Sequence, residues 1–213
     1  MIRKELVEYV EREILPRYLA FDKAHSIDHA QTVIAQSGAL ATHYPQLDEE
    51  MVYVVAAFHD TGLCGGRERH HIISGEILRA DKFISSLFAA DQIQTMIEAI
   101  EDHRASAKSS PRSLYGAVVA EADRVISVET TLRRTVQYGL KANPEANPDQ
   151  HFERFCNHLQ EKYAKGGYLK LYIPHSENAA RLAELRVVIS DPTTLRTHFD
   201  RIFAEEIATA KNE

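Results

Sequence analysis

The sequence predicts an all-α protein, and three observations support this. Apolar residues recur at helical spacing over most of its 213 residues. Residues typical of helix N-caps precede several of these stretches, namely Ser26, Asp48, Asp91 and Asp191. Histidines and aspartates stand where the apolar patterns end or break, as in a helical bundle that directs its ligands into one pocket. At this length, with 44% hydrophobic residues, we expect one domain over residues 1–213.

The charge balance restricts the kinds of partner. The formal net charge is -6 and the sequence pI is about 6.0. An extended nucleic-acid interface needs clustered Lys and Arg, so this composition argues against one. A small anionic substrate is still compatible with it, since only the local field of the site matters there.

The sequence also predicts where the protein resides. Its two cysteines, Cys64 and Cys156, match no disulfide or zinc-ribbon pattern, which fits a reducing cytoplasm. The N-terminus is charged and has no apolar signal region, and no apolar run approaches the ~18 residues of a membrane span. We therefore expect a soluble, cytoplasmic protein without a membrane partner.

The first half of the chain divides into helices. Residues 3–21 read as an amphipathic helix that Pro16 bends or ends. Further helices are expected from Ser26 to about residue 44, from Asp48 to about residue 58, from residue 70, from Asp91 to about residue 102, and over 114–126.

The second half, about residues 129–213, is also helical by pattern. Phe152 and Phe155 belong to an aromatic stripe, and the neighbouring His151 and His158 are more typical of packing residues than of ligands. Helices are expected over 179–189 and 191–208. We expect this half to cover the site and set substrate size, and a homodimer contact is compatible with it.

Several histidines and aspartates in the first half are ligand candidates. His59 and Asp60 end the apolar run 54–58, where an unpaired buried aspartate would be costly without a cation. His29 points inward near the start of its helix, although a satisfied core histidine is the alternative. Asp123 interrupts a buried helix, with a salt bridge to Arg124 or another arginine as the alternative.

These residues resemble a known family. The pattern His29…His59-Asp60…Asp123, with the contexts His-Ala-Gln-Thr-Val, Ala-Ala-Phe-His-Asp-Thr-Gly and Glu-Ala-Asp-Arg, is similar to the HD-domain metal-dependent phosphohydrolases. His71 and His103 are similar to the extra ligands of the subgroup that holds two metals. The resemblance covers roughly residues 24–127, so the expected core is about 22–128.

The resemblance implies a function and a cofactor. It implies one or two divalent transition metals (Mn, Fe, Ni, Co or Zn), which lower the pKa of bound water. Asp60 would bridge two metals and act as the catalytic carboxylate. The substrate would be a small phosphorylated molecule, such as a nucleotide, cleaved at a phosphomonoester or phosphodiester. Residues expected to meet its phosphate are His25, His70, Arg67, Arg104 and Arg124, the last also a structural partner for a carboxylate.

Two alternatives remain open at this stage. The same ligand set supports oxygen chemistry in an HD-type di-iron oxygenase. A non-catalytic sensor that binds a nucleotide is the other. The chain lacks the Gly-Tyr-Pro motif of the cyclic-dinucleotide phosphodiesterases, because Gly166-Gly167-Tyr168 lies elsewhere and has no proline.

Overall fold

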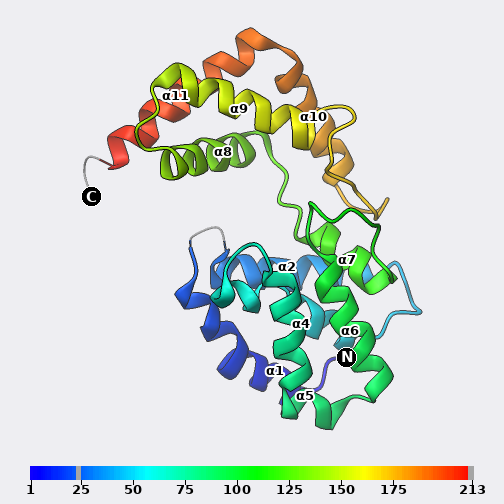
Figure 1. Ribbon diagram of the computed structural model, residues 1–213. Coiled ribbons are helices and arrows are strands. Elements are labelled where there is room, and N and C mark those ends of the chain that lie inside the picture. The colour runs from blue at the N-terminus through cyan, green and yellow to red at the C-terminus, as the bar shows by residue number, and fades with distance from the viewer. Residues whose placement is uncertain (23–24, 211–213) are drawn as a thin grey trace. The chain divides into compact units, whose positions relative to one another are not determined.

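The computed structural model describes residues 1–22 and 25–210, and every regular element in these ranges is a helix, which confirms the all-α prediction. The chain forms two compact units (Figure 1). One is Met1–Arg124 with Tyr172–Ser176, and we call it the N-terminal unit. The other is Val125–Leu171 with Glu177–Glu213, the C-terminal unit. None of the described helices is both long and apolar enough to cross a membrane.

The N-terminal unit is built around helix α3 (Glu49–Phe58), which packs against α2 (Ile27–Ala41), α6 (Ala90–Asp102) and α7 (Leu114–Ala122). Its residues Val54 to Phe58 are 0% exposed, because this half of the helix is apolar on all sides. The 3₁₀ turn η4 (Thr61–Gly65), α4 (His70–Ala80) and α5 (Lys82–Leu87) complete the unit, with α4 packed on α6 and η4. The end of α3 therefore lies inside the protein, with neighbours on several sides.

The N-terminal segment changes its helical winding along its length. It runs from α1 (Lys4–Tyr9) through a π-helical turn, η1 (Val10–Ile14), to the 3₁₀ turn η2 (Leu15–Ala20). Pro16 has no N–H and its ring would clash with a carbonyl in a continuing α-helix, so the helix expected over 3–21, with Pro16 bending or ending it, is divided into these three windings. Leu6, Val10 and Ile14 still face the core at 0% exposure.

The observed N-cap residues can be compared with the predicted helix starts. Ser26 and Asp48 are N-caps as predicted: the Ser26 side chain accepts from the His29 N–H, and the Asp48 side chain accepts from the first-turn N–H groups of α3. The prediction for Asp91 is wrong, because α6 begins at Ala90 and Asp91 lies in its first turn. There the Gln92 side chain accepts the N–H of Ala89 at 3.0 Å.

A short segment from the second half of the chain belongs to the N-terminal unit. Glu121 of α7 is 0% exposed and accepts the backbone N–H of Tyr172 at 2.7 Å and the hydroxyl of Ser176. Ile173 packs on Val118 in a small apolar cluster. A buried carboxylate is costly unless it is hydrogen-bonded, so Glu121 fixes residues 172–176 on α7.

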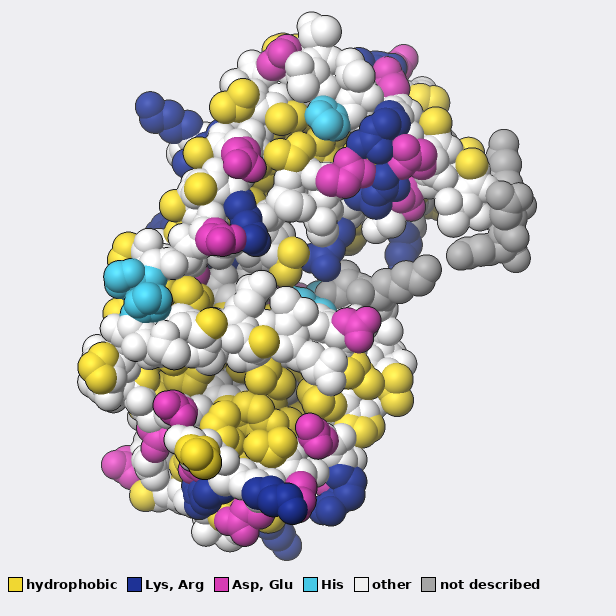
Figure 2. Space-filling model, turned by 180° about the vertical axis from the view of Figure 1, so that it is seen from behind, with side chains coloured by type: hydrophobic (Ala, Val, Ile, Leu, Met, Phe, Trp, Pro, Cys, Tyr) yellow, Lys and Arg dark blue, Asp and Glu magenta, His cyan; other side chains and the backbone are white. Residues whose placement is uncertain are grey.

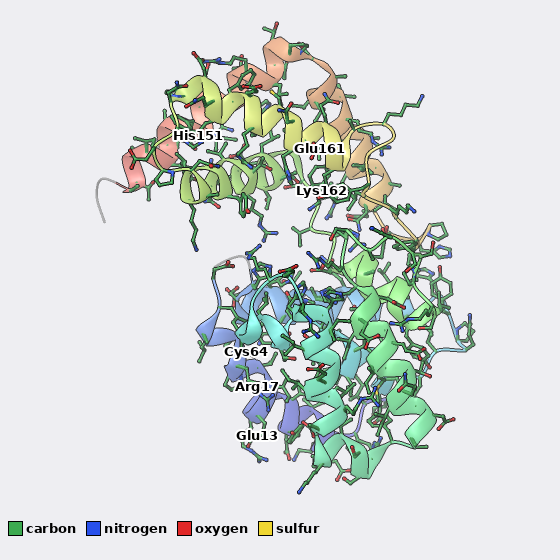
Figure 3. All side chains as sticks on the ribbon, in the orientation of Figure 1. Glu13, Arg17, Cys64, His151, Glu161 and Lys162 are labelled. Atoms are coloured by element: carbon green, nitrogen blue, oxygen red, sulfur yellow. The ribbon has the colours of Figure 1, made fainter. Side chains whose placement is uncertain are left out.

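The C-terminal unit consists of α8 (Val128–Ala142), α9 (Pro148–Tyr163), α10 (Asn178–Ser190) and α11 (Pro192–Ala210). Aromatic rings fill its core: Phe155 and Phe199 are 0% and 1% exposed, and their centroids lie 5.2 Å apart. His151 of α9, labelled in Figure 3, lies 5.4 Å from the Phe203 ring, as expected of a packing residue.

Candidate metal centre

Helix ends place the candidate ligands in the N-terminal unit. His29 lies in the first turn of α2 and is 9% exposed. His59 and Asp60 follow the last residue of α3 and are 0% and 3% exposed. His103 follows α6 and Asp123 follows α7. Each candidate ligand therefore lies at or near the end of a helix, and that end is inside the protein.

One group of ligand atoms comes from His29, His59 and Asp123, all within 4.8 Å of one another. The Asp123 Oδ1 lies 3.1 Å from the His29 Nε2 and 3.8 Å from the His59 Nε2. The two histidine Nε2 atoms are 3.4 Å apart. This group brings together three of the residues that the sequence singled out.

A second group comes from Asp60, His70 and His103. The Asp60 Oδ1 lies 3.4 Å from the Nε2 atoms of both His70 and His103, which are 3.1 Å from each other. The other Asp60 oxygen, Oδ2, faces the first group and lies 3.2 Å from the His59 Nε2. Asp60 therefore joins the two groups, with one oxygen directed to each.

Backbone carbonyls orient three of the imidazole rings. The Nδ1 atoms of His59, His70 and His103 lie 2.7, 2.8 and 2.6 Å from the carbonyl oxygens of residues 56, 67 and 100. Because a carbonyl only accepts, each Nδ1 carries the proton, and the Nε2 of a neutral ring then presents a lone pair. The Nε2 atoms of His70 and His103 face each other at 3.1 Å, so a proton or a cation is needed between them.

The electrostatics of the centre favour positive charge. Burial lowers the pKa of His59, but the Asp60 and Asp123 carboxylates outweigh it and raise this pKa to about 9. Burial opposes ionisation of Asp60 and Asp123, yet the surrounding histidines hold both carboxyl pKa values below their ordinary range. Since these fields attract a proton to the centre, they equally attract a metal cation.

The His70 ring has the opposite behaviour. Burial, and then the neighbouring His103, lower its pKa to about 4, so the ring is neutral near pH 7. A neutral ring is the form that binds a metal. The donor set of four imidazoles and two carboxylates fits Mn, Fe, Co, Ni or Zn better than Mg or Ca.

Two other contacts hold the centre in place. The hydroxyl of the buried Tyr18 donates to the Ala57 carbonyl at 2.9 Å and accepts the Asp60 N–H at 3.3 Å. Arg124, 6% exposed, donates from Nη1 to the His103 carbonyl at 3.0 Å. Sequence reasoning missed Tyr18, because its hydroxyl contacts α3 only in the folded chain.

His70, rather than His71, stands in the second group. α4 begins at His70, and its phase points the His70 ring to Asp60, whereas no ligand atom of His71 belongs to either group among the described residues. The His71 Nδ1 is buried without a hydrogen-bond partner in this part of the chain. In the described residues His70 therefore lies among the candidate ligand atoms, where His71 was expected, and His70 becomes a candidate ligand as well as a candidate for phosphate contact.

The four other phosphate candidates are divided between the edge of the centre and the interior. His25 and Arg67 lie at the edge, with side chains 21% and 57% exposed. Arg104 donates to the Glu68 carbonyl at 2.6 Å and so supports the loop before α4. Arg124 is buried against the His103 carbonyl, so the structure favours the structural role for it over phosphate contact.

Comparisons with known proteins agree with this geometry. Residues 26–127 match the family model described as HD domain, which confirms the resemblance. Curated proteins and solved structures give no match. Because the matched residues include every ligand of both groups and all the helices that carry them, we identify residues 26–127 as an HD domain.

Proposed function

We propose that this protein is a metal-dependent phosphohydrolase that cleaves a phosphomonoester or phosphodiester of a small molecule. The observation that carries the proposal is the pair of facing Nε2 atoms in each group, 3.4 and 3.1 Å apart, with Asp60 between the groups. HD domains typically belong to metal-dependent phosphohydrolases, and residues 26–127 form such a domain.

Two cations would be held by neighbouring ligands. His29, His59 and Asp123 would hold one and His70 and His103 the other, with Asp60, which lies beside both groups, shared between them. When bound, such a metal lowers the pKa of a coordinated water and supplies a nucleophile near neutral pH. A single metal is compatible with the first group alone, and His70 and His103 would then accept a proton.

The protein's own residues orient the candidate ligands and exclude bulk water from them. Three backbone carbonyls fix the rings of His59, His70 and His103, so their Nε2 atoms need no rearrangement to bind. Tyr18 and Arg124 position the backbone at Asp60 and His103. Burial of His59 and Asp60 keeps bulk water from the inner side of the centre, which strengthens its electrostatic interactions.

The surface supports a small substrate. On the face that Figure 2 shows, Lys and Arg side chains are interspersed with Asp and Glu rather than gathered into one basic area. At a net charge of -6, this distribution is unsuited to an extended nucleic acid. His25 and Arg67 lie at the edge of the centre, outside both groups of candidate ligands, where they would meet an anionic part of a substrate such as a nucleotide. A homodimer stays a proposal.

Metal analysis followed by an activity assay tests this function. Protein purified without chelator should contain one or two transition metals per chain, and these should be lost in His59→Ala and retained in the core variant His151→Phe. The metal-loaded protein should then hydrolyse p-nitrophenyl phosphate or its bis-ester. Oxygen consumption by iron-loaded protein without ester hydrolysis would instead favour the oxygenase, and a stability unaffected by added metal would reject a metal centre.

A further inference from the structure

Three side chains form a polar cluster at the edge of the metal centre. The Asp22 Oδ2 accepts a hydrogen bond from the Arg67 Nη2 at 2.7 Å. The Asp22 Oδ1 lies 2.7 Å from the His25 Nδ1. The two nitrogens are 3.3 Å apart and converge on this one carboxylate. We call this the rim cluster.

The rim cluster adjoins both metal groups. The His25 ring lies with its centroid 6.0 Å from that of His29, a ligand of the first group. The Arg67 carbonyl accepts the Nδ1–H of His70, a ligand of the second group, at 2.8 Å. An anion at the rim cluster would therefore be within one small molecule's length of a phosphate at the centre.

The chemistry of the rim cluster is that of an anion site. An arginine and an imidazole that converge on one carboxylate offer the same donors to a phosphate. The Asp22 and Arg67 side chains are 42% and 57% exposed. Since exposed ion pairs are weak, a more highly charged anion can displace the Asp22 carboxylate.

We propose, resting on the proposed function, that Arg67 and His25 bind a second phosphate of the substrate, and that Asp22 occupies this position until the substrate displaces it. The substrate class is then a bisphosphate, whose second phosphate is separated from the reacting one by a short spacer. Arg67 and His25 act as specificity residues, and Asp22 is an internal competitor.

Calorimetric titration of the metal-loaded full chain tests this. The probes are methylphosphonate and the bisphosphonates with one, two or three carbons between the phosphorus atoms. At least one bisphosphonate should bind about tenfold more tightly than methylphosphonate, and Arg67→Gln should abolish this gain without changing methylphosphonate binding. A bisphosphonate gain that is unchanged in Arg67→Gln would overturn the assignment.

The proposed role of Asp22 as a competitor is tested by a separate substitution. Asp22→Asn should tighten bisphosphonate binding about twofold to fivefold, the range of an exposed ion pair. In the double variant with Arg67→Gln this gain should vanish, whereas a change in the general field would persist. Unchanged or weaker binding in Asp22→Asn, or a gain that survives in the double variant, would show that Asp22 is no competitor.

A matched control and the single-phosphonate probe keep the tests separate. Glu13→Gln removes a carboxylate paired with Arg12 at 2.9 Å and exposed to a similar extent, 48%, and it should leave binding unchanged (Glu13 in Figure 3). Methylphosphonate binding that does not require metal would contradict the proposed function. Metal-dependent methylphosphonate binding without a bisphosphonate gain would contradict only the rim assignment.

Discussion

Both compact units bury histidine side chains, but they surround them with different groups. His59 of the N-terminal unit has the carboxylates of Asp60 and Asp123 within 3.2 and 3.8 Å. His151 of the C-terminal unit packs against Phe203, with a ring distance of 5.4 Å. His158 of the same helix has Lys162 and Arg154 as its charged neighbours. Burial alone therefore does not favour a cation site, whereas burial beside carboxylates does.

Removing the shared carboxylate should give the largest effect. Asp60→Asn keeps the shape of the side chain but removes the charge that contacts both groups, so we expect metal content to fall and hydrolysis to drop by about a thousandfold or more. Elemental analysis and initial rates measure this. His151→Phe, which alters a buried histidine without carboxylates, should change neither, and equal losses in both variants would erase the distinction between the units.

A core truncation should separate stability from metal binding. Phe155 is 0% exposed and contacts the Phe199 ring, so Phe155→Ala should lower the free energy of unfolding of the C-terminal unit by about 3–5 kcal/mol. Urea unfolding measures the loss. Metal content per chain should stay at the wild-type value under native conditions, and its loss would mean that the centre depends on this core.

Close backbone packing in the N-terminal unit gives the next effect. A Cβ on Gly62 would lie 2.2 Å from the His70 carbonyl oxygen and 2.4 Å from the Ser74 nitrogen, so Gly62→Ala must push η4 away from α4. We expect a loss of about 1–3 kcal/mol in unfolding free energy and weaker metal binding, since His70 moves with α4.

An exposed glycine in a neighbouring helix is the matched control. A Cβ on Gly38 of α2 would meet no other segment of the described chain within 4 Å, so Gly38→Ala should stabilise the protein by about 0.5–1 kcal/mol. Denaturant unfolding of both variants measures the difference. If Gly62→Ala were as stable as Gly38→Ala, the contact between η4 and α4 would not be the feature that sets the position of His70.

The contact between η4 and α4 also explains what the sequence predicted and what it did not. Ser26, Asp48, His59 and Asp60 are read from local patterns, because a cap or the end of an apolar run is encoded by neighbouring residues. The choice between His70 and His71 depends on the phase of α4, which packs closely on Gly62 and on α6. Such long-range contacts are not visible in helical periodicity.

The smallest effect is a difference in pH dependence between two histidines of the metal-free protein. The pKa of His59, about 9, lies above the ordinary value of 6.5 because two carboxylates outweigh burial. Its stabilising contribution is complete below pH 6.5 and is lost as the pH rises through 9. Burial, then Lys162 and Arg154, lower the pKa of His158 to about 4, so the unfolded chain takes up this proton first as the pH falls below 6.5.

His158 should therefore cost stability between pH 6.5 and 4, by about 1 kcal/mol once its partial exposure is considered. Urea unfolding of chelator-treated wild type and His158→Gln across this range measures the cost, and the variant should lose less stability on acidification. Histidine NMR titration of the same samples assigns each pKa directly. If both histidines titrated near 6.5, neighbouring charges would not distinguish the two units. The carboxylates of the N-terminal unit would then not favour a cation over the surroundings of His158.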